Sequence, residues 1–81
     1  MYINTPKELG KLIAKGRKDK GWNQSQLASH IGIHQPEVSK LENDPSKFDL
    51  IIIMKALALI GADLIVEPRS KSDTEDSGLG F

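Results

Sequence analysis

The chain has 81 residues and no cysteine, and its 11 basic and 11 acidic side chains give a formal net charge of zero. The length predicts a single domain, and the absence of cysteine excludes disulfides and thiolate metal sites. No apolar run has the length of a membrane span and no leader pattern precedes the domain, so we expect a cytoplasmic protein with no membrane partner. So small a core is often supplemented by a second subunit.

The charges are distributed unevenly along the chain. Residues 1–43 contain seven Lys/Arg and four Asp/Glu, a net charge of +3, whereas residues 44–81 contain four and seven, a net charge of −3. A basic first half is compatible with a polyanion bound on one side of the molecule. A solvated charge distribution without function explains the difference equally well.

The first helix is predicted over residues 5–20. Thr5 and Glu8 have the spacing of a capping box, and Pro6 occupies the first helical position. Gly21 provides the stop. The predicted inward face consists of Leu9, Leu12, Ile13 and Gly16.

A short second helix is predicted over residues 24–31. Asn23 is its cap, and Gln26 stands three residues later, where its side chain can reach back to the backbone of the cap. Trp22 and Leu27 flank the cap at the spacing of a hydrophobic staple, an interpretation of Trp22 that we prefer to base stacking.

The third helix is predicted over residues 35–42, after a turn at Gly32. Pro36 disfavours a helical conformation of Gln35, so this helix could begin one residue later. The small core behind the two helices is predicted to contain Leu27, Ala28, Ile31, Ile33, Val38 and Leu41.

A fourth helix, capped by Asp49, is predicted over residues 50–60 after a loop that contains Pro45. This helix is apolar almost all round, so it must be covered on more than one face, and we expect a second subunit to supply the additional cover. These four helices make residues 1–62 the helical domain.

Residues 63–67 are predicted to form a strand, although a frayed extended segment is the alternative. The simplest partner is the same strand in a second copy, which would give an antiparallel ribbon across a twofold axis. The residues predicted to form this dimer contact are Leu64, Ile65 and Val66. Residues 68–81 form a polar tail that is predicted to be disordered.

Neither a metal centre nor a catalytic site is predicted. His30 and His34 have a spacing that suits zinc on one helix, but Gly32 interrupts the helix between them. The chain also lacks a nucleophile–base set and a glycine-rich phosphate loop, so we expect no enzyme activity and no cofactor.

The string "GWNQSQLASHIGIHQPEVSKLEN" resembles the DNA-binding domain of phage repressor and Cro-like proteins, the XRE family. The resemblance implies an all-α, lambda repressor-like helix-turn-helix bundle of four to five short helices, in addition to the C-terminal β-strand that pairs across a homodimer. It also implies a structural ion pair between Arg17 and Glu42. The DNA-binding residues that it implies are Gln24, Ser25, His34, Gln35, Pro36, Ser39, Lys40 and Asn43.

The implied roles agree with the chemistry of these side chains. Glutamine can bind adenine through two hydrogen bonds, lysine donates to the acceptors of guanine, and serine suits either a base or a phosphate. In the family, the residue at the position of Gln24 binds a phosphate and braces the third helix. Contacts to phosphates position the protein without reading the sequence.

The segments "NTPKELG", "GWNQSQLA", "IGIHQPEVSKLENDP" and "GADLIVEP" are similar to HipB-type antitoxins. That resemblance implies a nucleoid-associated homodimer that binds a palindromic operator in its own promoter. It further implies a partner, a serine/threonine kinase toxin of the HipA type. A stand-alone repressor of the XRE family without a toxin is the alternative.

Overall fold

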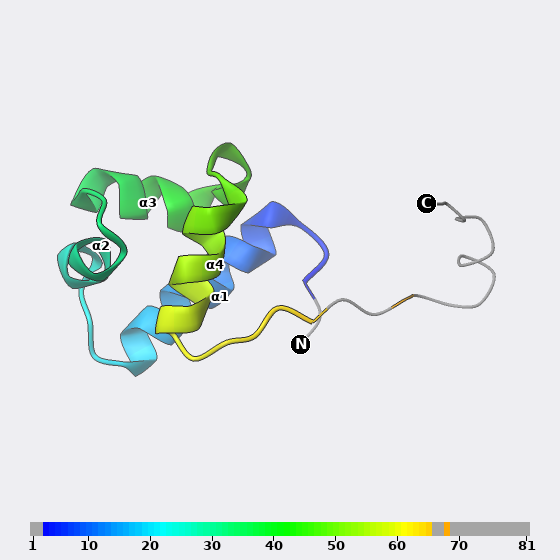
Figure 1. Cartoon of the computed structure of the whole chain (residues 1–81), viewed down its shortest axis with the longest axis horizontal. Helices are drawn as coiled ribbons and strands as arrows, with labels where there is room; N and C mark the ends of the chain where they lie inside the picture. The colour runs from blue at the N-terminus through cyan, green and yellow to red at the C-terminus, as the bar shows by residue number, and fades with distance from the viewer. Residues whose placement is uncertain (1–2, 66–67, 69–81) are drawn as a thin grey trace.

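The computed structural model describes residues 3–65 and 68, which contain four α-helices and one turn of 3₁₀-helix. The elements in chain order are α1 (Pro6–Asp19), α2 (Gln24–Ile31), α3 (Gln35–Asn43), η1 (Pro45–Lys47) and α4 (Leu50–Leu59). α3 packs against both α1 and α2, and α4 packs against α2. Figure 1 shows the arrangement of the four helices. Within the described residues, the predicted all-α helix-turn-helix bundle is confirmed.

Both predicted capping boxes are present. The Thr5 Oγ1 accepts a hydrogen bond from the Glu8 backbone N–H at 3.2 Å, and the Glu8 carboxylate accepts one from the Thr5 N–H at 3.2 Å. At the start of α2, the side chains of Asn23 and Gln26 exchange the equivalent bonds at 2.8 Å. A cap of this kind stabilises a helix by about 1 kcal/mol, so local sequence defines these two helix starts.

The turn between α2 and α3 depends on Gly32, whose φ of +96° is a left-handed conformation. α3 begins at Gln35 and not one residue later, so the later start is wrong. Pro36 lies in the first turn of α3, where a backbone N–H has no partner within the helix, and its missing donor therefore costs no hydrogen bond. The Glu37 carboxylate accepts from the His34 N–H at 2.9 Å and secures the helix start.

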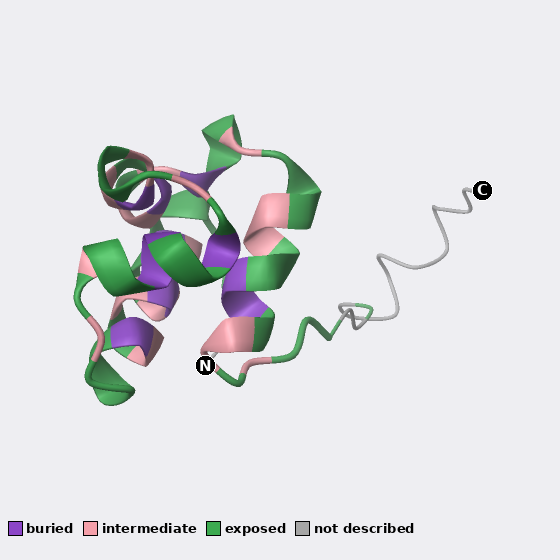
Figure 2. Ribbon diagram, turned by 60° about the vertical axis from the view of Figure 1, so that its left-hand side comes forward, coloured by how far each residue is buried: buried purple, intermediate pink, exposed green. Residues whose placement is uncertain are grey.

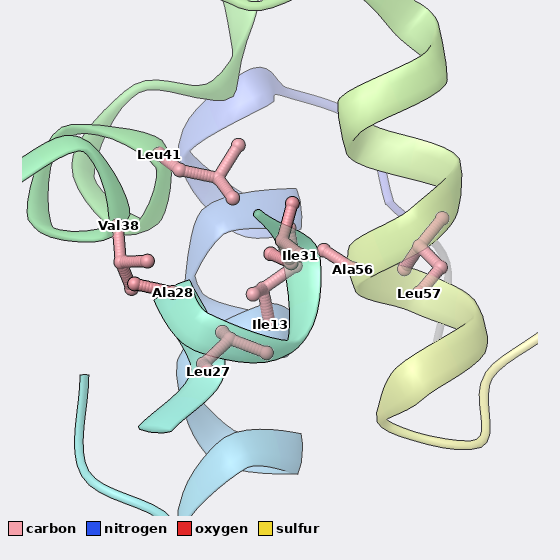
Figure 3. Packing of buried hydrophobic residues seen from close by; sticks show 8 residues of the cluster. All are labelled: Ile13, Leu27, Ala28, Ile31, Val38, Leu41, Ala56 and Leu57. Atoms are coloured by element: carbon pink, nitrogen blue, oxygen red, sulfur yellow. The ribbon is translucent and has the colours of Figure 1, made fainter. Parts of the chain in front are cut away.

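The hydrophobic core lies between the four helices, where side chains from all of them converge (Figure 3). Trp22 is half-buried against this core, as its predicted hydrophobic role requires. Its ring also contacts His30, with the ring centroids 4.4 Å apart. The buried cluster consists of Ile13, Leu27, Ala28, Ile31, Val38, Leu41, Ala56 and Leu57.

α1 and the end of α3 approach closely at Gly10. A Cβ atom added to Gly10 would overlap the carbonyl oxygen of Glu42 and would lie 2.8 Å from its carbonyl carbon. Only a residue without a side chain lets the two backbones approach this far. The approach brings Arg17, about two helical turns further along the same face of α1, into contact with Glu42.

α4 has one buried and one exposed apolar face. Asp49 occupies its N-cap position but makes no capping hydrogen bond with its side chain in the described part of the chain, contrary to the prediction. Ala56 and Leu57 face the core, whereas the outer side of α4 is exposed (Figure 2). The large exposed apolar side chains of α4 are those of Leu50, Ile51 and Met54, with 62%, 67% and 50% of their surface accessible.

The chain leaves the bundle after Gly61. Residues 62–65 form neither helix nor strand, and Leu64 and Ile65 are exposed. Val66 and Glu67 lie outside the described residues, so the strand over 63–67 and its pairing remain a prediction. The predicted tail also lies outside them, apart from Pro68. No helix formed by residues 3–65 is long and apolar enough to cross a membrane.

Candidate nucleic-acid interface

Four of the predicted DNA-contacting residues form one patch on α3. Gln35, Pro36, Ser39 and Lys40, which we call the α3 polar surface, follow the helical spacing that brings side chains to one face. Ser39 is half-buried and the other three are exposed. The surface therefore presents an amide, a hydroxyl and an ammonium group on a helix that is anchored from behind by Val38 and Leu41.

The remaining predicted residues border this patch. His34 is exposed at the N-cap of α3, and Asn43 is exposed at its last position, where its side-chain amide donates to the carbonyl oxygen of Ser39 at 2.9 Å. Gln24 and Ser25 occupy the first two positions of α2. The helix-turn-helix thus brings the start of α2 next to the start of α3.

A hydrogen bond joins the two helix starts. The Gln35 side-chain amide donates from Nε2 to the Gln24 Oε1 at 2.8 Å. Gln24 in turn donates from its Nε2 to the Glu42 Oε1 at 3.0 Å. Gln24 therefore connects the first residue of α3 with its last turn, and the orientation of Gln35 depends on this connection.

Arg17 and Glu42 form a buried ion pair behind Gln24. Arg17 Nε donates to Glu42 Oε2 at 2.7 Å and Arg17 Nη2 donates to Glu42 Oε1 at 3.2 Å, while only 10% and 7% of the two side chains are exposed. Arg17 Nη1 also donates to the carbonyl oxygen of Trp22 at 2.8 Å. Each buried side-chain polar atom of the described residues has a partner, which is the condition under which a buried pair is tolerated.

The resemblance implied that Gln24 braces the third helix, but three of these individual contacts were not predicted from the sequence. The bonds of Gln24 to Gln35 and to Glu42 join residues 11 and 18 positions apart, so no local pattern announces them. No sequence pattern indicates the hydrogen bond from Arg17 to the Trp22 carbonyl either. The capping role of Glu37 could have been found, because it stands three residues after the N-cap His34.

The geometry of the site suits hydrogen bonding rather than metal binding. Among the described residues, no group of three or more histidine, cysteine, aspartate or glutamate side chains could hold a metal ion. The α3 polar surface offers the donors and acceptors that base edges and phosphate oxygens match.

Comparison with known proteins assigns the family. A family model described as "Helix-turn-helix domain" matches residues 3–67. Antitoxin HipB of Escherichia coli strain K12 is 38% identical over 55 residues, which cover 68% of this chain and 62% of the relative. Antitoxin HipB of Escherichia coli O6:H1 strain CFT073 is equally similar over 55 residues and is covered to 58%. The chain thus spans less than two thirds of the curated relatives that it matches.

Solved structures agree with this assignment. The "HipA-HipB-O2-O3 complex" contains a chain with a TM-score of 0.76 and 30% identity, which covers 86% of this chain and 99% of its own length. The "HipB-O4 20mer complex" gives a TM-score of 0.75 at 30% identity, with the same coverage. The protein therefore belongs to the helix-turn-helix domain family, in which it is similar in sequence and fold to the HipB antitoxins.

Proposed function

We propose that the protein is a dimeric, sequence-specific DNA-binding antitoxin that represses its own operon and neutralises a HipA-type serine/threonine kinase. DNA binding is supported above all by the α3 polar surface, because its first side chain is held by Gln24 instead of moving freely in solvent. The similarity to HipB chains solved in complexes with DNA supports the same conclusion.

In this proposal α3 lies in the major groove. Gln35 contacts adenine, Lys40 contacts guanine acceptors, and Ser39 and Pro36 contact neighbouring base edges. Contacts to the DNA backbone come from the residues that border the patch, namely Gln24, Ser25, His34 and Asn43. The Arg17–Glu42 pair has a structural role, because it ties α3 to α1 behind the DNA-binding surface.

Dimerisation is proposed to use α4 and the segment that follows it. Met54 on α4 and Leu64 and Ile65 beyond it expose 50%, 58% and 73% of their surface. Burial of such surface on association contributes roughly 25 cal/mol per Å². Together with Val66, the exposed segment would pair with its copy, and two α3 polar surfaces would meet half-sites about 34 Å apart or a multiple of it.

The kinase partner rests on the resemblance to HipB, since one similar HipB chain was solved with HipA. Co-expression tests this partner. The product of the neighbouring gene should arrest growth when expressed alone, and growth should return, with a stable complex, when this protein is present. A harmless neighbour that does not co-purify would leave the stand-alone repressor as the function.

DNA binding is tested with duplexes that carry the promoter of the protein's own operon. Lys40→Ala should weaken binding to the cognate site by about 1–3 kcal/mol and relax the base preference at one position. Gln24→Ala should weaken binding to all sequences. Lys11→Ala, at an exposed position of α1 outside both the α3 polar surface and α4, is the matched control and should leave affinity unchanged. Unchanged operator affinity of Lys40→Ala would contradict the assigned surface.

A further inference from the structure

The Glu42 carboxylate is shared between the ion pair and the DNA-binding surface. Its Oε2 accepts from Arg17, and its Oε1 accepts from both Arg17 and Gln24, the latter at 3.0 Å. Only 7% of the Glu42 side chain is exposed. This buried carboxylate therefore contacts a residue of the candidate interface without being part of its surface.

The carboxylate determines how the amide of Gln24 is oriented. A carboxylate paired with an arginine only accepts hydrogen bonds, so Gln24 must turn its NH₂ group toward Glu42. The Oε1 of Gln24 consequently faces away from Glu42, at 2.8 Å from Nε2 of Gln35. Because the Gln24 Oε1 can only accept a hydrogen bond, Gln35 must turn its NH₂ group toward Gln24 and its own Oε1 away from it.

The orientation of Gln35 decides which groups remain for a ligand. One N–H group is used by Gln24, whereas the Oε1 and the second N–H make no hydrogen bond to the part of the chain that the structure describes. An acceptor beside a donor matches the N6 amino group and N7 of adenine. With the amide reversed, Gln35 would present its two N–H groups, which match the O6 and N7 acceptors of guanine.

We propose that Glu42 is a specificity-determining positioning residue, which makes Gln35 select adenine over guanine through the orientation of Gln24. The inference rests on the proposed DNA binding through α3. Glu42→Gln preserves the size of the side chain but adds a donor, so the amide of Gln24 can reverse. Gln24→Met removes the connection to Gln35 and leaves the Arg17–Glu42 pair in place.

The experiment selects preferred sites from random duplex DNA with the full chain, and then titrates duplexes that carry adenine or guanine at single positions. Gln35→Ala identifies the position that Gln35 contacts. There, Glu42→Gln and Gln24→Met should each lower the adenine-to-guanine affinity ratio roughly fivefold or more, the value of one bidentate contact. Ser25→Ala should lower affinity for both duplexes and leave their ratio unchanged.

The outcomes separate this inference from the proposed function. If the wild-type chain enriches no sequence, sequence-specific DNA binding fails, and the role of Glu42 fails with it. If it enriches a site but the ratio is unchanged in folded Glu42→Gln, or the base at that position is not adenine, Glu42 has only a structural role. Circular dichroism monitors folding. If the loss of a buried charge unfolds Glu42→Gln, an unchanged ratio in Gln24→Met is sufficient to refute the inference, because Glu42 can act on Gln35 only through Gln24.

Discussion

Replacing Gly10 with alanine tests the contact between α1 and the end of α3. The substitution by itself favours the helix, because alanine is about 1 kcal/mol more favourable than glycine in a helix interior. In the folded protein, the new Cβ would overlap the carbonyl oxygen of Glu42 and would lie 3.3 Å from that of Leu41. A backbone carbonyl cannot rotate away as a side chain can, so α1 and α3 must move apart.

The balance of these effects is destabilising. Overpacking of a core costs typically about 1–3 kcal/mol, and overlap with backbone places Gly10→Ala at about 3 kcal/mol. The helix-propensity gain offsets about 1 kcal/mol of this, so the free energy of unfolding should fall by about 2 kcal/mol. In a domain of this size, that corresponds to a decrease in Tm of about 8–16 °C.

Thermal unfolding followed by circular dichroism measures the effect, at one protein concentration because the proposed dimerisation would make Tm concentration-dependent. Gly16→Ala is the matched control in the same helix. Its added Cβ would lie 2.6 Å from the Ile60 Cδ1, which can rotate away, and 2.7 Å from the Ile60 Cβ, which moves only with the backbone after α4, whereas at Gly10 the nearest atom is a backbone oxygen. Gly16→Ala should therefore lose less stability. A Gly10→Ala variant as stable as the wild type would refute the close approach of α1 and α3.

Three further predictions concern the core, α4 and the turn before it. Leu27→Ala empties a fully buried position and should lower the free energy of unfolding by about 2–5 kcal/mol in urea denaturation. Met54→Lys should shift sedimentation equilibrium toward monomer, while Ser29→Lys, at an exposed position of α2, should not; equal effects would count against α4 as the dimer contact. The hydrogen bond from the Ser46 hydroxyl lowers the pKa of Asp44 below its usual range, so its stabilisation is present above the ordinary pKa and is lost as the pH falls through the lowered pKa. Ser46→Ala should raise the pKa of Asp44 toward its ordinary value in an NMR titration, and an unchanged pKa would show that this bond is not the cause.

The elements that depend on neighbouring residues could be predicted from the sequence. Thr5 and Asn23 cap α1 and α2 as their spacing indicates, and the buried positions follow the helical periodicity. The start of α3 was harder to predict, because Pro36, considered by itself, disfavours a helical conformation of Gln35. The bond between Glu37 and the His34 N–H supports the earlier start, and Pro36 falls where a missing N–H has no consequence.

The contacts that cross the fold could not be predicted in the same way. The Gln35–Gln24–Glu42 connection depends on the angle between α2 and α3 and on the closeness of α1, which Gly10 permits. Sequence periodicity shows which side of a helix is buried, but not which polar ends meet there. The excess apolar surface of α4 was evident in the sequence. The residues that would cover it belong, in the proposed dimer, to a second copy of the chain, so the pattern of one chain does not identify them.

The unequal anchoring of the α3 polar surface has a consequence for the redesign of binding specificity. The side chains of Pro36 and Lys40 make no hydrogen bond to any part of the chain that the structure describes, so each can be exchanged alone. Gln35 is hydrogen-bonded to Gln24, so a replacement at one of these positions leaves the other glutamine without its hydrogen-bond partner. Libraries intended to change the preferred bases should therefore vary Gln24 and Gln35 jointly, and Pro36 and Lys40 independently.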